Sequence, residues 1–163
     1  MTSCSERGLA MPARRQLMKG AAAGAGLGVL SPVLLAQNAD APVSPAVNAL
    51  VNDFLKGGKP QGEGLKLDLP VLGDNPSSVP IKVSVTLPID ARNWCEELIL
   101  IAESNPVPLA SRFRFFPAMG TAEAAVRLRL IASQNIRALA RMNDGRLLMA
   151  RQFIEVAPGS CGL

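Results

Sequence analysis

Apolar and polar residues alternate along three segments of the chain. Leucine, isoleucine and valine occupy every second position of the segments 65–69, 81–87 and 126–130, with charged or hydroxyl side chains between them. Because successive side chains of a β-strand point to opposite faces, this period of two predicts strands with one buried and one solvated face. The continuous apolar run 98–101 predicts a more central strand that is buried on both faces.

Turn residues separate the predicted strands. Asn143-Asp144-Gly145 lies between the segments 136–142 and 147–156, and a turn of this composition is a strong signal for a β-hairpin. Roughly seven short strands at this spacing are typical of an immunoglobulin-like fold. We therefore predict an all-β, antiparallel β-sandwich over residues 64–158.

Residues 40–63 predict one N-terminal helix followed by a linker. Ser44 is a suitable N-cap, Pro45 suits the first helical position, and Gly57-Gly58 is expected to end the helix. The apolar positions have the helical spacing i, i+3, i+4, i+7, i+8: Val47, Leu50, Val51, Phe54 and Leu55. Such a helix either binds a partner or covers the core or edge of its own domain, and the sequence leaves both interpretations open.

The first 39 residues contain the three parts of an export signal in the right order. Arg14-Arg15 form a twin-arginine start, a mildly apolar Ala/Gly-rich run follows, and small residues near Ala36 to Ala41 offer cleavage positions. The apolar run is too weak to span a bilayer permanently, which takes about 20 strongly apolar residues. We expect residues 1–39 to be a cleaved twin-arginine signal and the mature protein to be exported folded to the periplasm.

Removal of this signal changes the charge of the protein. Four of the 17 basic residues and one of the 13 acidic residues lie in residues 1–39, which leaves 13 basic and 12 acidic residues from Asp40 onward. No basic patch remains that would indicate binding to nucleic acid or to an anionic membrane surface.

One thiol is the main candidate for chemistry. The chain contains no histidine, which excludes Ser-His and Cys-His catalysis and histidine-based metal sites. Cys161 lies in the C-terminal arm, Gly159-Ser160-Cys161-Gly162-Leu163, whose small residues bring too little apolar area to offset the entropy lost on ordering. A thiol on such a mobile arm is a covalent attachment point that other enzymes can reach, an inert terminal group, or half of a disulfide with Cys95. Cys95 itself is predicted to be a small packing residue at the start of a strand.

The other candidates have ordinary structural interpretations. Glu96 and Glu97 are adjacent on a predicted strand, so they are expected to face opposite ways and not to act as a carboxylate pair. Four arginines are expected on solvated strand faces: Arg112, Arg114, Arg127 and Arg129. Three aromatic residues are expected in the core: Phe113, Phe115 and Phe116.

The chain resembles the SoxY family, the sulfur-carrier subunits of the periplasmic thiosulfate-oxidising Sox system. The family's carrier tail reads Gly-Gly-Cys-Gly-Gly, and here the corresponding residues are Gly159, Ser160, Cys161, Gly162 and Leu163. The resemblance also extends along the mature domain, through motifs that include Leu67-Asp68-Leu69-Pro70, Val79-Pro80-Ile81-Lys82-Val83, Arg127-Leu128-Arg129-Leu130 and Asp144-Gly145.

The resemblance implies a carrier without catalysis of its own. Thiosulfate-derived sulfur would be held covalently on Cys161, with Gly159, Ser160 and Gly162 giving the arm its flexibility, and no cofactor or metal would be needed. The implied partners are a SoxZ-like subunit in a heterodimer and, transiently, a cytochrome, a hydrolase and a sulfane dehydrogenase. No nucleic acid and no membrane is expected among the partners.

Two other functions remain open at this point. One is a structural or adhesive β-sandwich whose tail is pinned by a Cys95–Cys161 disulfide. The other, a thiol-disulfide enzyme or redox sensor, is weak because the sequence has no Cys-x-x-Cys motif and no thioredoxin-like βαβ pattern.

Overall fold

The computed structural model describes residues 42–157. The predicted export signal, residues 1–39, and the predicted arm, residues 159–163, lie outside the described residues. The described elements follow in the order α1 (Pro45–Leu55), β1 (Leu65–Asp68), β2 (Leu72–Gly73), β3 (Val79–Val85), β4 (Cys95–Ala102), β5 (Leu109–Arg114), the 3-10 helix η1 (Pro117–Met119), β6 (Glu123–Leu128), β7 (Gln134–Met142) and β8 (Leu147–Val156).

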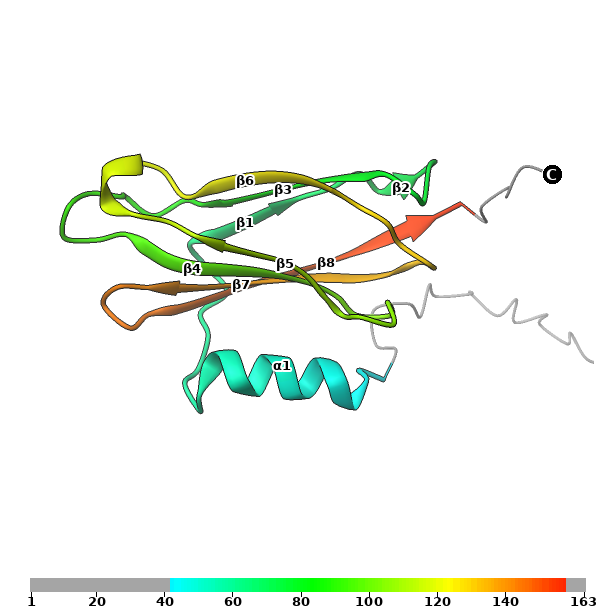
Figure 1. Cartoon of the computed structure of the whole chain (residues 1–163), viewed down its shortest axis with the longest axis horizontal. Coiled ribbons are helices and arrows are strands. Elements are labelled where there is room, and N and C mark those ends of the chain that lie inside the picture. Colours follow the sequence, from blue (N-terminus) through cyan, green and yellow to red (C-terminus); the bar gives the residue numbers. More distant parts are fainter. Residues whose placement is uncertain (1–41, 158–163) are drawn as a thin grey trace, which may run out of the picture. The chain divides into compact units, whose positions relative to one another are not determined.

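The strands form two sheets that pack face to face, as the sequence predicts. One sheet has the order β1-β3-β6 and the other the order β2-β8-β7-β4-β5. Figure 1 shows three layers in side view: the three-stranded sheet, the five-stranded sheet, and α1 on the outer face of the latter. All of the pairs between named strands are antiparallel except that of β2 with β8, which is parallel.

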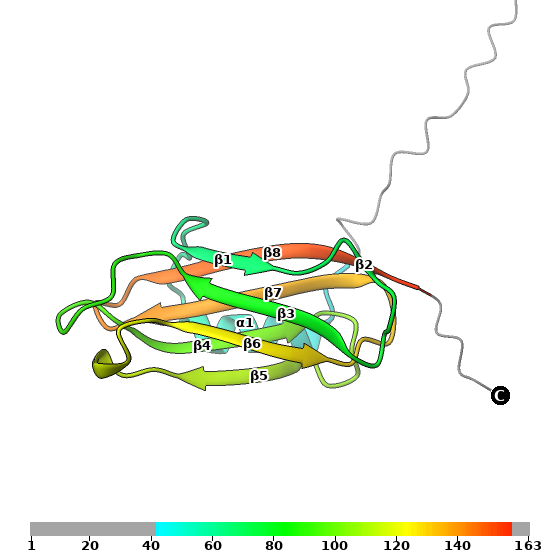
Figure 2. The same ribbon diagram turned by 90° about the horizontal axis from the view of Figure 1, so that it is seen from above.

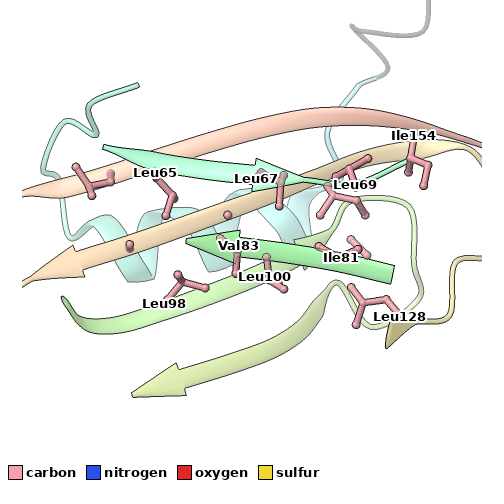
Figure 3. Packing of buried hydrophobic residues seen from close by; sticks show 14 of the residues in the cluster. Leu65, Leu67, Leu69, Ile81, Val83, Leu98, Leu100, Leu128 and Ile154 are labelled. Carbon is pink, nitrogen blue, oxygen red and sulfur yellow. The ribbon is translucent and has the colours of Figure 1, made fainter. Parts of the chain in front are cut away.

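The main core lies between the two sheets and is built by the alternating residues of the strands. Leu65 and Leu67 of β1 and Ile81 and Val83 of β3 point from the three-stranded sheet toward the five-stranded sheet. Figure 3 shows these side chains meeting Leu98 and Leu100 of β4 and Ile154 of β8. The polar residues between them, such as Lys66 and Lys82, are exposed on the outer face.

Helix α1 covers its own domain. Its side chains Val47, Val51 and Phe54 are buried against Ile99 and Ile101, on the face of β4 that points away from the main core. This second apolar cluster explains why the run 98–101 is continuous, because β4 is buried on both faces. The apolar stripe of the helix is therefore not free for a partner.

The helix boundaries differ slightly from the prediction. The Ser44 hydroxyl accepts a hydrogen bond from the Val47 backbone N–H, as an N-cap should. The helix ends at Leu55, and Lys56 adopts the left-handed conformation with φ 48° before Gly57 does so with φ 83°. Gly58 then passes so close to Leu147 that a Cβ atom there would lie 2.4 Å from its Cδ1.

The strand predictions are confirmed in place, with shifts of a few residues at the ends. Strand β6 begins at Glu123 and ends at Leu128, whereas the predicted segment is 126–130. Strand β3 begins at Val79, two residues before the predicted segment 81–87. Strand β2 is not predicted by the sequence, because its two residues are too few to show an alternation. The hairpin of β7 and β8 turns at Gly145, which has φ 87° as such a turn requires.

Candidate functional site

The structure describes the chain up to the root of the C-terminal arm. Cys161, Gly159, Ser160 and Gly162 lie outside the described residues, so no geometry tests their predicted roles. What the structure defines is the point from which they depart, at the end of β8. We call residues 155–157 the arm root.

Hydrogen bonds on both sides hold the arm root in the sandwich. On one side, the backbone N–H of Glu155 donates to the Val71 carbonyl (3.0 Å) and that of Ala157 to the Gly73 carbonyl (3.1 Å). On the other side, the backbone N–H of Val156 donates to Ser133 Oγ (2.9 Å), whose hydroxyl donates to the Val156 carbonyl (3.4 Å). The short parallel strand β2 thus extends the pairing of β8 to its last residue, and the arm leaves from a fixed position.

A buried amide beside the arm root ties two loops together. The side chain of Gln134 donates from Nε2 to Asn105 Oδ1 (3.0 Å), and its Oε1 accepts from the Ser104 backbone N–H (2.7 Å). Asn105 in turn donates from Nδ2 to the Arg129 carbonyl (2.9 Å). The loop after β4 and the connection after β6 are therefore fastened to the start of β7 at the same end of the sandwich as the arm root.

Cys95 lies at the opposite end of the sandwich from the arm root. It pairs with Met142 at the end of β7, whereas Ile154 pairs with Gln134 at the beginning of β7, eight residues away. At about 3.3 Å per residue of strand, Cys95 and Ile154 are therefore about 26 Å apart along the strand direction. Figure 2 shows the same arrangement, with β8 ending at one end of the sandwich and β4 beginning at the other.

This separation excludes the disulfide between Cys95 and Cys161 within one chain. Cys161 is five residues after Val156, so even a fully extended backbone places it no more than about 18 Å from Val156. A disulfide requires Cα atoms within about 7 Å of each other. Since Val156 is itself beyond the level of Ile154, the two cysteines cannot meet without unfolding of β8.

The predicted packing role of Cys95 is confirmed. Its side chain is 0% exposed, and its thiol is free and donates weakly to the Glu97 carbonyl (Sγ to O, 3.5 Å). Burial raises the pKa of the Cys95 thiol to about 11, although backbone hydrogen bonds at Glu97 and Arg141 act in the opposite direction. This thiol is neither accessible nor ionised near neutral pH, so it is unsuited to sulfur chemistry.

The prediction that Glu96 and Glu97 face opposite ways is wrong. A β-bulge interrupts the register of β4 with β7 between Cys95 and Glu97. As a result both carboxylates reach the Arg141 guanidinium, Glu96 at 4.0 Å and Glu97 through a direct hydrogen bond. Sequence alternation cannot reveal a bulge, which inserts one extra residue into the strand.

The four arginines of the two predicted strand faces are exposed, as expected, but Arg112 also has a structural partner. Its Nη1 lies 2.7 Å from Oε1 of the buried Glu97. Among the three phenylalanines, Phe115 is buried and Phe113 packs against the core, whereas Phe116 is exposed, contrary to the prediction. Phe116 lines a hollow of about 330 Å³ beside Trp94 and Arg114, at the end of the sandwich far from the arm root.

Residues 42–157 contain no group of three or more Cys, Asp or Glu side chains placed to hold a metal ion. Within the same residues, no helix has the length and apolar character needed to cross a bilayer.

Comparisons with known proteins identify a family. The family model described as sulfur oxidation protein SoxY matches residues 51–161, which is more than half of the chain and includes Cys161. No curated protein sequence matches the chain significantly.

Solved structures share the fold. The sulfur carrier protein SoxY from Chlorobium limicola f thiosulfatophilum is 18% identical, with a TM-score of 0.58 over 69% of this chain and 96% of that one. A variant of the superoxide reductase (neelaredoxin) from Ignicoccus hospitalis is 21% identical, with a TM-score of 0.51 over 63% of this chain and 86% of that one. At these identities the likeness concerns the fold alone.

Proposed function

Because the chain belongs to the SoxY family, we propose that it is a covalent sulfur carrier whose attachment point is Cys161. The observation that carries this proposal is the position of Cys161 inside the family match, four residues beyond a firmly anchored arm root. The register of β7 supports it further, because it removes the alternative of a tail pinned to Cys95.

The proposed chemistry begins with the formation of one S–S bond. The Cys161 thiolate joins the terminal sulfur of thiosulfate, and two electrons pass to a cytochrome partner, which leaves a thiosulfonate on the cysteine. A hydrolase then adds water to the sulfonate sulfur, releasing sulfate and two protons and leaving a persulfide on Cys161. A sulfane dehydrogenase would next remove six electrons and six protons while three water oxygens are added to the outer sulfur.

We propose that the carrier supplies the thiol and presents it to the partners, and that the partners supply the catalysis. The chain has no histidine to act as a base or to bind a metal, and Cys95 is buried with a raised thiol pKa. Sulfur exchange requires a thiolate that partners can reach, which a residue between Gly and Ser on a short arm provides.

We further propose that the mature protein forms a heterodimer with a SoxZ-like subunit in the periplasm. Since the apolar stripe of α1 is covered by its own sheet, we propose that the contact uses a surface other than this stripe. Size exclusion with light scattering of the co-expressed pair tests this, and a monodisperse monomer in the presence of the partner would contradict it.

A pair of cysteine variants tests the carrier proposal. Cys161→Ser is expected to abolish thiosulfate-dependent turnover in a reconstituted system and to leave the midpoint of thermal unfolding unchanged. Cys95→Ala is the matched control, because it removes the other thiol of the mature chain and should retain turnover. Turnover by Cys161→Ser at the wild-type rate would overturn the proposal.

A further inference from the structure

Exposed apolar side chains occur at the end of the sandwich where the arm root lies. Four of them lie at this end of the sandwich and define what we call the arm-end face: Val71 (80% exposed), Leu72 (48%), Val107 (73%) and Ile131 (59%). They come from β2 and the residue before it, from the loop between β4 and β5, and from the connection between β6 and β7. Segments far apart in the sequence therefore expose apolar side chains at one end of the sandwich. A single exposed apolar side chain would need no explanation, but several at one end indicate an interaction site.

Hydrogen bonds place these residues relative to the arm root. The Val71 carbonyl accepts from the Glu155 backbone N–H (3.0 Å). The Ile131 backbone N–H donates to Asn105 Oδ1 (3.3 Å), in the loop that also carries Val107. That loop is closed by the Ala102 backbone N–H, which donates to the Pro108 carbonyl (2.8 Å). The arm-end face is thus formed by hydrogen-bonded loops at the same end of the sandwich as the end of β8.

The length of the arm determines how close a partner enzyme must come. Cys161 is four residues beyond Ala157, so its Cα lies at most about 14 Å from that of Ala157. Consider an enzyme whose reacting centre lies about 10 Å below its surface. The arm then leaves a gap of no more than about 4 Å between the enzyme surface and the arm root. Atoms at this distance are in van der Waals contact. An enzyme with a recessed centre therefore has to press against the arm-end face when it reacts with Cys161.

We propose that the arm-end face is the docking surface for the enzymes that act on Cys161. This inference rests on the proposed carrier function and goes beyond it, because it assigns recognition to residues of the folded domain. The partner that fits is an enzyme with a recessed sulfur site whose rim is apolar. Burial of Val71, Leu72, Val107 and Ile131 against that rim stabilises the encounter while the arm is inside.

The test compares two matched variants of the mature chain. Ile131→Asp places a charge in the arm-end face, and Met119→Asp places the same charge on a similarly exposed apolar residue (54%) after β5, at the opposite end of the sandwich. Each chain is loaded chemically with tetrathionate: the Cys161 thiolate attacks a central sulfur, a thiosulfonate forms on Cys161, and thiosulfate leaves. The measured quantity is kcat/KM for sulfate release by the hydrolase partner.

Ile131→Asp is expected to lower kcat/KM by about tenfold or more, as for a central interface residue, because the aspartate must be desolvated against an apolar rim. Met119→Asp is expected to stay within about twofold of the wild type, the range of a surface change outside an interface. The rate of Cys161 alkylation by iodoacetamide should be equal in all three proteins, since the arm itself is unchanged. Val107→Asp, in a different loop, should repeat the effect of Ile131→Asp at an unchanged unfolding midpoint.

The outcomes separate this inference from the proposed function. If the loaded wild type releases no sulfate, the carrier function fails and the docking surface with it. If the wild type is active and Ile131→Asp and Val107→Asp match it, the carrier function stands and the docking surface is wrong. An equal loss in Met119→Asp would also overturn the docking surface, because the charge would then act without regard to position.

Discussion

Glu97 near the start of β4 and Glu103 directly after its end are each buried between two arginine guanidiniums. Glu97 pairs with Arg112 and Arg141, at 2.7 Å for the Arg112 Nη1. Glu103 pairs with Arg137 and Arg151, at 2.7 Å and 2.8 Å from their Nη2 atoms. Between these two clusters lie Ile99 and Ile101, which α1 covers.

One of these clusters contacts the helix near its C-terminal end, in addition to the packing along its apolar stripe. The Arg141 guanidinium, already held by Glu97, also lies 5.1 Å from the ring centroid of Phe54, near the end of α1. The two charged clusters therefore bound the apolar area on which the helix packs.

Glu103→Gln is expected to lower the free energy of unfolding by about 3 kcal/mol, because it leaves the Arg137 guanidinium, whose side chain is only 12% exposed, without its carboxylate. Glu123→Gln is the matched control, since Glu123 pairs with Lys82 where both side chains are about half exposed, and its loss should be much smaller. Urea unfolding of the three proteins measures the difference. Equal losses in both variants would show that burial of the pair contributes nothing.

These clusters mark the limit of what the sequence could predict. The alternation of the strands and the spacing of Val47, Val51 and Phe54 depend only on local period, so the sandwich and its helix were predictable. The pairing of Glu103 with Arg151 joins β8 to the end of β4, and no local pattern specifies such a contact.

The same reasoning applies to the candidate site. Cys161 could be identified from its small neighbours, but its distance from Cys95 follows from the register of β4, β7 and β8. Val71, Val107 and Ile131 resemble ordinary apolar residues of loops and strand ends in the sequence. Their shared position at the arm-root end of the sandwich emerges only when the strands are assembled.

The stability of the protein is expected to fall between about pH 9 and about pH 11. Burial raises the Cys95 thiol pKa from its ordinary value of 9.0 to about 11, so in this window the unfolded chain releases a proton that the folded chain keeps. The unfolded state then binds fewer protons, and the free energy of unfolding decreases as the pH rises. Below about pH 9 both states keep the proton and the full contribution of the buried thiol is present.

Urea unfolding at a series of pH values tests this in a Cys161→Ser background, which leaves Cys95 as the one thiol of the chain from Asp40 onward. Adding Cys95→Ala should make the decline in the free energy of unfolding between about pH 9 and about pH 11 shallower. An identical pH profile with and without Cys95 would contradict the raised pKa.

The two thiols of the mature chain are expected to differ sharply in reactivity. Cys161, between residues too small to shield it, should alkylate rapidly and should slowly form linked dimers in air that a reductant reverses. Cys95, which is fully buried, should react only after unfolding. Alkylation kinetics with peptide mapping measure both, and a bridge from Cys161 to Cys95 of the same chain would contradict the distance derived from the strand register.

The central claim, that Cys161 carries sulfur, is tested most directly by the intact mass of the protein purified without reductant from its own cells while they oxidise thiosulfate. The account predicts that part of the population is heavier by a sulfane sulfur or a thiosulfonate group. The added mass should map to the peptide that contains Cys161 and should disappear on reduction. A protein with an unmodified Cys161 throughout thiosulfate oxidation, or with its adduct on Cys95, would contradict the account.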